Sequence, residues 1–146
     1  MKKKVIISAC LLGENCRYDA QTKKQNAVLE AFADYDIIPF CPESPVFGTP
    51  RQRISVVQVD GKNRIITDET NEDVTKLLDD EINSFMDLNK DIDEIVLKSK
   101  SPSCGYKTTP ILNQQKEVLE LGNGIAAEMI KHKYSNVSIK DENSYI

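Results

Sequence analysis

The feature that most constrains the fold is a set of short apolar runs that each lead toward a cysteine. Val5–Cys10 (VIISAC) and Ile37–Cys41 (IIPFC) are rich in apolar and β-branched residues, a composition typical of buried strands. A third such run, Glu94–Lys98, precedes Cys104. In open α/β sheets, ligands bind at the carboxyl ends of the strands. We therefore expect thiols that are distant in sequence to meet at one edge of a sheet.

Helical patterns between these runs complete an α/β sequence. Three segments carry apolar residues at helical spacing: Gln25–Asp34, Asn71–Asn89 and Gly124–Lys133. The second is the longest, and we expect Thr70 or Asn71 to cap it. Strands that alternate with helices predict a mostly parallel sheet with helices on both faces.

A β-hairpin interrupts this alternation. Ile54–Val59 and Arg64–Thr67 flank Asp60-Gly61, a strong two-residue turn signal. The segment before the hairpin holds four residues that disfavour regular structure and predict an irregular loop: Pro42, Pro45, Gly48 and Pro50.

Length and charge limit the functions that this chain can have. With 146 residues we expect one domain over residues 1–146, large enough to bury a core. The net charge of −4 argues against nucleic-acid binding by bulk charge, and no apolar run has the length of a membrane span. MKKK before VIISAC resembles a lipoprotein signal, but its apolar stretch is about five residues, shorter than a signal h-region. We therefore expect a cytoplasmic protein, whose free thiols favour metal binding or catalysis over disulfides.

The four cysteines, Cys10, Cys16, Cys41 and Cys104, are compatible with four kinds of site. An iron–sulfur centre is favoured, because thiolates are its usual ligands. Ordinary buried thiols are the next alternative. Structural zinc is less favoured because the paired C-x-x-C knuckles are missing, and disulfides are disfavoured in a reducing compartment. Spacing alone leaves open whether three or four of the cysteines bind a centre.

Two polar residues near these cysteines are candidates for catalysis. Glu43 lies two residues beyond Cys41, where a carboxylate beside a cofactor would be a proton-transfer group. Ser101 lies three residues before Cys104, where its hydroxyl would orient water or substrate. The plainer alternatives are a solvated loop carboxylate and a turn hydroxyl, since Ser-Pro initiates turns.

Further residues near the cysteines are candidates for substrate binding. Arg17 and Asp19 would form the rim of a pocket or an ordinary loop ion pair, and Tyr18 would stack on a flat ligand. Arg51 would hold an anionic group bidentately, although such arginines are usually solvated. Ser103 is included as a candidate substrate contact.

Two other patterns are interpreted as structural. Gly122-Asn123-Gly124-Ile125-Ala126-Ala127 matches G-x-G-x-x-A, but a dinucleotide site needs this motif after the first strand of a βαβ unit. We interpret it as the amino terminus of a helix. His132, the only histidine, lies near the end of that helix and is expected at the surface.

The motifs SACLLGENCRYD, CPE, GTPR and KSKSPSCG together resemble the signatures of the domain of unknown function 523 family, whose characterised members are thiouracil desulfidases. The resemblance covers nearly the whole chain. It implies a compact Rossmann-like α/β domain and a 4Fe–4S cluster held by three cysteines, with a fourth iron that binds the sulfur of a thiolated uracil. It also implies catalytic roles for the glutamate of CPE and the first serine of SPSCG, here Glu43 and Ser101.

Three segments depart from the family pattern, and all border the expected pocket. They are Ala20, where family members usually have glycine, the Ser44–Gly48 stretch before T-P-R, and Gly105–Lys107. For the three cluster ligands we favour Cys10, Cys41 and Cys104, which follow three separate strands, with Cys16 as the alternate.

The resemblance thus implies an enzyme that removes sulfur from a thiolated uracil, as free base or nucleotide, by non-redox hydrolysis and releases hydrosulfide. Two alternatives stay open. One is an iron–sulfur or zinc-binding module without turnover, and the other is an enzyme that inserts sulfur into a nucleobase.

Overall fold

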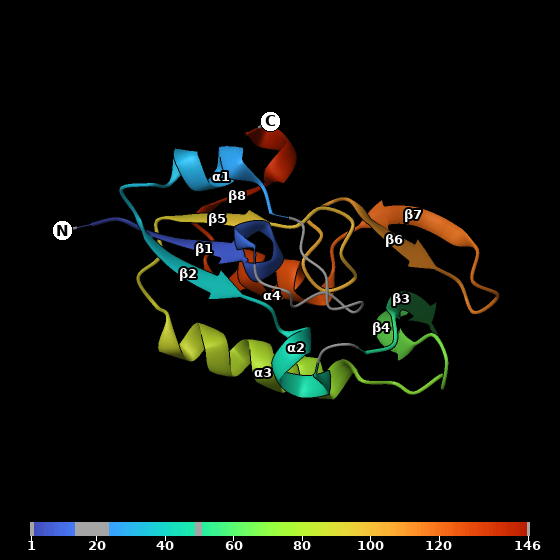
Figure 1. Cartoon of the computed structure of the whole chain (residues 1–146). Helices are drawn as coiled ribbons and strands as arrows, with labels where there is room; N and C mark the ends of the chain where they lie inside the picture. The colour runs from blue at the N-terminus through green and yellow to red at the C-terminus, as the bar shows by residue number, and fades with distance from the viewer. Residues whose placement is uncertain (1, 14–23, 49–50, 146) are drawn as a thin grey trace.

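The computed structural model describes residues 2–13, 24–48 and 51–145, which form two four-stranded sheets with helices packed on them (Figure 1). The four strands of sheet A are β1 (Lys4–Ser8), β2 (Asp36–Phe40), β5 (Glu94–Leu97) and β8 (Ser138–Asp141). The segments next to them in the chain form the helices α1 (Asn26–Ala31) and α4 (Ile125–Lys133) and the 3-10 helices η1 (Ala9–Leu12) and η2 (Glu142–Ser144). The remaining elements are α2 (Glu43–Phe47), β3 (Ile54–Val59), β4 (Lys62–Thr67), α3 (Thr75–Leu88), β6 (Thr109–Leu112) and β7 (Val118–Gly122). Sheet A has the strand order β2-β1-β5-β8, and sheet B has the order β4-β3-β6-β7.

Strand β1 lies inside sheet A and is buried on both faces. Val5 and Ile7 pack in a cluster with Val28 of α1, whereas Ile6 belongs to the larger core that includes Leu78 of α3. Successive side chains of a strand point to opposite faces, so an unbroken apolar run needs cover on both sides. Figure 1 shows α1 on one face of sheet A and α3 on the other. The expected parallel sheet with flanking helices is confirmed.

Sheet B contains the predicted hairpin and two strands that the sequence did not predict. β3 and β4 pair antiparallel around Asp60-Gly61, and both turn residues have positive φ. β6 pairs parallel with β3, and β7 pairs antiparallel with β6. β7 gives no strand signal because its apolar residues, Val118, Leu119 and Leu121, are exposed and lie on both faces. The hairpin is therefore part of a second, mixed sheet.

Two local expectations about helices are wrong. The proline-containing segment predicted as a loop holds helix α2, and Pro45 lies in its first turn, where a missing N–H breaks no intrahelical bond. Neither Thr70 nor Asn71 caps α3; the Asp73 side chain instead accepts the Thr75 backbone N–H at 3.0 Å. No helix in the described ranges is long and apolar enough to cross a membrane.

The topology of sheet A brings three strand ends to one edge. β2, β1 and β5 are hydrogen-bonded neighbours and run parallel, with Ser8 beside Phe40 and Ile7 beside Val96. Their carboxyl ends therefore lie together, and the segments that follow the three strands meet there.

Candidate functional site

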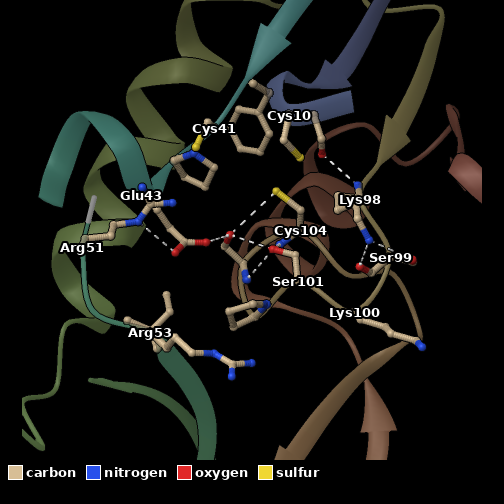
Figure 2. A pocket seen from close by; sticks show the side chains of 16 residues that line it. Cys10, Cys41, Glu43, Arg51, Arg53, Lys98, Ser99, Lys100, Ser101 and Cys104 are labelled. Carbon is tan, nitrogen blue, oxygen red and sulfur yellow. Dashed lines mark hydrogen bonds and ion pairs between the residues drawn. The ribbon is translucent and has the colours of Figure 1, made fainter. Parts of the chain in front are cut away.

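A cavity of about 290 Å³ lies at this carboxyl edge (Figure 2). Residues that follow β1, β2 and β5 line most of it, and Arg51, Arg53 and Ile54, at the start of β3, line the rest. Figure 2 shows side chains from all of these segments directed into the same space. The cavity therefore depends on segments that are far apart in the sequence.

Three cysteines reach this cavity from three different segments. Cys10 lies in η1 directly after β1, Cys41 directly follows β2, and Cys104 lies in the loop after β5. Cys10 and Cys104 are buried and Cys41 is half-buried. Cys10, Cys41 and Cys104 therefore lie together at the carboxyl edge of sheet A, as expected from the sequence.

The environment of Cys104 suits a metal ligand. Burial raises the pKa of its thiol to about 12, the neighbouring Cys41 adds to this effect, and hydrogen bonds with Ser8 and Ser103 oppose it. Such a thiol stays protonated at neutral pH unless a cation stabilises the thiolate, which is what a bound metal does. The site is therefore a poor place for a cysteine nucleophile.

The donor set fits an iron–sulfur cluster. Such clusters are bound by separate thiolates, each to its own iron, and three thiols face this cavity. Within residues 2–13, 24–48 and 51–145, no three His, Cys, Asp or Glu side chains are grouped so as to hold a single metal ion. The residues present thus match the group that the sequence motifs imply.

Glu43 is the carboxylate of the cavity. It is the first residue of α2, is 8% exposed and lines the cavity together with Cys41. The Ser103 hydroxyl donates to its Oε2 at 2.7 Å, and Arg51 Nε approaches its Oε1 at 3.4 Å. Both oxygens therefore have a donor. Arg51, predicted to bind substrate, lines the cavity and contacts Glu43 and the Gly48 carbonyl, and its contact with substrate stays a prediction.

Ser101 faces the same cavity and also shapes the loop that carries Cys104. Its hydroxyl accepts the backbone N–H of Cys104 at 3.1 Å and that of Ser103 at 3.3 Å. Its carbonyl accepts the Thr109 hydroxyl at 2.6 Å and the Gly105 N–H at 2.9 Å. The Ser-Pro turn expected from the sequence is thus held at several points.

Sequence reasoning missed an ionic cluster below the cavity. Lys98 lines the cavity, and its ammonium lies 2.9 Å from Glu142 Oε2. Glu142 also accepts the Ser99 backbone N–H and hydroxyl, each at 2.8 Å. Burial raises the pKa of Glu142, but these hydrogen bonds outweigh it and hold the pKa below its usual value. The position of Lys98 at the end of a predicted strand was a usable signal, whereas nothing in the sequence links it to Glu142.

Two further cations contribute to the cavity lining. Arg53 and Lys100 both line the cavity and are exposed at its rim. Lys100 has a positive φ of 65°, which is uncommon for a residue with a Cβ. Among the described residues, the rim of the cavity therefore carries two cationic side chains, although the chain as a whole is acidic.

Four of the expected site residues lie outside the described part of the chain. They are Cys16, Arg17, Tyr18 and Asp19, all within residues 14–23. His132, expected at the surface, is exposed and lies 3.1 Å from Glu128.

Comparisons with known proteins agree with this geometry. A sequence model of the 2-thiouracil desulfurase family matches residues 5–142. Among solved structures, the chain is similar to one described as the 4Fe–4S-dependent thiouracil desulfidase TudS, with 30% identity and a TM-score of 0.74. That match covers 98% of this chain and 93% of the other. No curated protein sequence matches the chain. The family match includes every segment that lines the cavity.

Proposed function

Because the chain belongs to the 2-thiouracil desulfurase family, we propose that it hydrolyses a thiolated uracil to the uracil and hydrosulfide. Water supplies the oxygen that replaces sulfur, so the reaction needs no external oxidant or reductant. One observation carries this proposal: three cysteines and a buried carboxylate, from three segments that follow β1, β2 and β5, face a single cavity.

We propose a 4Fe–4S cluster as the cofactor, as described for the similar solved structure. Cys10, Cys41 and Cys104 are the proposed ligands, since they face the cavity from three segments, with Cys16 as the alternate. A cluster held by three thiolates supplies an iron without a protein ligand, which acts as a Lewis acid toward a thiocarbonyl sulfur.

Glu43 is proposed as the general base. Its carboxylate accepts a proton from the water that attacks the carbon bearing sulfur. Arg51 and Ser103 hold the two carboxylate oxygens, which fixes the direction from which water approaches. The Ser101 hydroxyl lies 3.3 Å from the Ser103 hydroxyl and completes the polar side of the cavity, where it orients water or substrate.

The charge at the rim favours an anionic substrate over the free base. We propose that Arg53 and Lys100, which are exposed residues of the cavity lining, contact the phosphate of a bound nucleotide. Arg17, Tyr18 and Asp19 are proposed to complete the base pocket. We therefore expect 4-thiouridine monophosphate to have a lower KM than 4-thiouracil.

The test uses protein prepared and loaded with iron and sulfide under anaerobic conditions. Loss of 4-thiouracil absorbance and release of hydrosulfide are followed for the wild type, Glu43→Gln and the matched control Glu120→Gln, on the exposed strand β7. We expect wild-type turnover, an unchanged control, and a rate about 10²–10⁴-fold lower for Glu43→Gln at equal iron content.

Each alternative has its own result in this assay. Glu43→Gln at the wild-type rate would remove the base from the mechanism. A loaded wild type that turns over neither thiouracil, thiouridine nor the monophosphate would favour a binding module. Formation of thiouracil from uracil and a sulfur donor would indicate sulfur insertion.

A further inference from the structure

Ser103 contacts more of the proposed machinery than any role as a substrate contact requires. Its side chain is 1% exposed, and its hydroxyl donates to Glu43 Oε2 at 2.7 Å. Ser103 Oγ also lies 3.3 Å from the Ser101 hydroxyl and 3.8 Å from Cys104 Sγ. A hydroxyl so enclosed by protein groups is placed to orient them.

The backbone on either side of Cys104 is held by the amino terminus of α4. The Ser103 carbonyl accepts the N–H of Ala126 at 2.7 Å and that of Ala127 at 3.3 Å. The Gly105 carbonyl accepts the Gly124 N–H at 2.8 Å. The first N–H groups of a helix have no partner within the helix, so here they bind the loop instead.

Gly124 is required by the close approach of these two segments. A Cβ at this position would lie 2.6 Å from the carbonyl carbon and oxygen of Ser103 and 2.7 Å from the Pro102 oxygen. All three are backbone atoms, which cannot rotate away as a side chain would. The φ of Gly124 is −66°, so the requirement is space and not backbone conformation.

The first glycine of the same motif, Gly122, provides a contrast. A Cβ at Gly122 would meet only the Ile111 side chain, at 3.1 Å and 3.4 Å. That side chain has rotatable bonds and is able to move by a few tenths of an ångström. The G-x-G-x-x-A pattern therefore contains one glycine that the loop contact requires and one that it does not.

We propose that Ser103, held in place by the amino terminus of α4 at Gly124, is a positioning residue for Glu43; this rests on the function proposed above. With Arg51 on Oε1 and Ser103 on Oε2, the plane of the carboxylate is fixed. Loss of the serine donor leaves one oxygen without its partner and frees the carboxylate to rotate. Because a misaligned base slows proton transfer without weakening substrate binding, kcat falls and KM does not.

The first experiment compares Ser103→Ala and Ser103→Thr in cluster-loaded protein. We expect Ser103→Ala to lower kcat about 10–100-fold with unchanged KM and iron content, and Ser103→Thr to restore most of the loss. In a Glu43→Gln background, Ser103→Ala should have little further effect, because the two residues act as a unit.

Two kinetic results would overturn this role. A raised KM with unchanged kcat would identify Ser103 as a substrate contact. If Ser103→Ala lowers kcat by the same factor in the wild-type and Glu43→Gln backgrounds, Ser103 acts independently of the carboxylate.

The second experiment needs no turnover. In metal-free protein, alkylation of each cysteine by iodoacetamide is followed by peptide mass spectrometry for Gly124→Ala and the matched control Gly122→Ala. We expect Gly124→Ala to expose the buried Cys104 and speed its alkylation several-fold, with Cys41 as the internal reference and the control unchanged.

If Cys104 is alkylated at the same rate in Gly124→Ala and Gly122→Ala, the proposed role of α4 in holding the Cys104 loop would be overturned. If Gly124→Ala fails to fold, the Ser103 series still decides the positioning role. A loaded wild type without turnover would overturn the proposed function and the kinetic role together, whereas alkylation would still decide whether α4 holds the loop.

Discussion

Sheets A and B have the same number of strands but contribute differently to the site. β1 of sheet A has three consecutive residues with no exposed surface, Val5 to Ile7. β7 of sheet B exposes Val118 by 61% and Leu121 by 62%. Sheet A is parallel throughout, whereas sheet B mixes parallel and antiparallel pairs.

The difference follows from strand direction. Parallel neighbours end at one edge, so the segments after β1, β2 and β5 bring Cys10, Cys41 and Cys104 to the same cavity. Antiparallel neighbours end at opposite edges, and sheet B adds to the described lining only the first residue of β3, Ile54, and the preceding Arg51 and Arg53. Sheet A thus supplies the proposed ligands, and the segment that enters sheet B supplies two arginines of the cavity wall.

The largest effect should come from removing the thiols at the edge of sheet A. We expect Cys10→Ser, Cys41→Ser and Cys104→Ser each to lose the cluster, because each removes a proposed ligand. Cys16→Ser should retain more iron and serves as the comparison. Iron and sulfide content after anaerobic loading provides the measurement; equal loss in Cys16→Ser with full retention in Cys41→Ser would overturn this choice of ligands.

A second prediction compares the stability of the two sheets. Ile6→Ala should lower the free energy of unfolding by about 2–5 kcal/mol, because it leaves a cavity between sheet A and α3. Leu121→Ala, on the exposed strand β7, should change it by less than about 0.5 kcal/mol. Urea unfolding of both variants tests this, and a comparable loss for Leu121→Ala would mean that β7 is covered in solution.

A smaller effect on stability than that of Ile6→Ala is expected from the ion pair between Asp73 and Arg64 of β4, in sheet B. Partial burial raises the pKa of Asp73, but hydrogen bonds from Arg64 and Thr75 outweigh it and lower the pKa from 3.8 to about 2. A lowered pKa in the folded state stabilises the fold above pH 4, and this stabilisation is lost as the pH falls toward 2. Because both Arg64 and Asp73 are about 40% exposed, Asp73→Asn should cost only about 0.5–1 kcal/mol at pH 7.

Urea unfolding of wild type and Asp73→Asn between pH 7 and pH 3 checks this prediction. The difference in stability between the two proteins should narrow as the pH falls below 4. A difference that is constant over this range would assign the effect to the hydrogen bonds with Thr75 and not to the charge.

The inner strands of sheet A, β1 and β5, were predictable because burial on both faces leaves an unbroken apolar run, as in Val5–Ile7. Strand β7 was not predictable. It is an exposed edge strand without an apolar face, so its sequence lacks the alternation of apolar and polar residues that indicates a strand. Helix α2 was hidden by Pro45, which the first turn tolerates.

The site was predictable only as far as strand ends could place it. Cys10, Cys41 and Glu43 lie at or just beyond such ends, so their convergence followed from parallel pairing. The contact between Ser103 and Glu43 joins residues 60 positions apart, and no local pattern encodes it. The link from Ser99 to Glu142 has the same character, because it depends on β8 lying beside β5.

The most direct test of the central claim is the ratio of products formed by cluster-loaded and metal-free wild-type protein. Uracil and hydrosulfide released from 4-thiouracil are both measured under anaerobic conditions. We expect about one hydrosulfide per uracil from loaded protein, as hydrolysis requires, and no turnover without the cluster. Equal rates from loaded and metal-free protein, or uracil formed without hydrosulfide, would contradict cluster-dependent hydrolysis at the edge of sheet A.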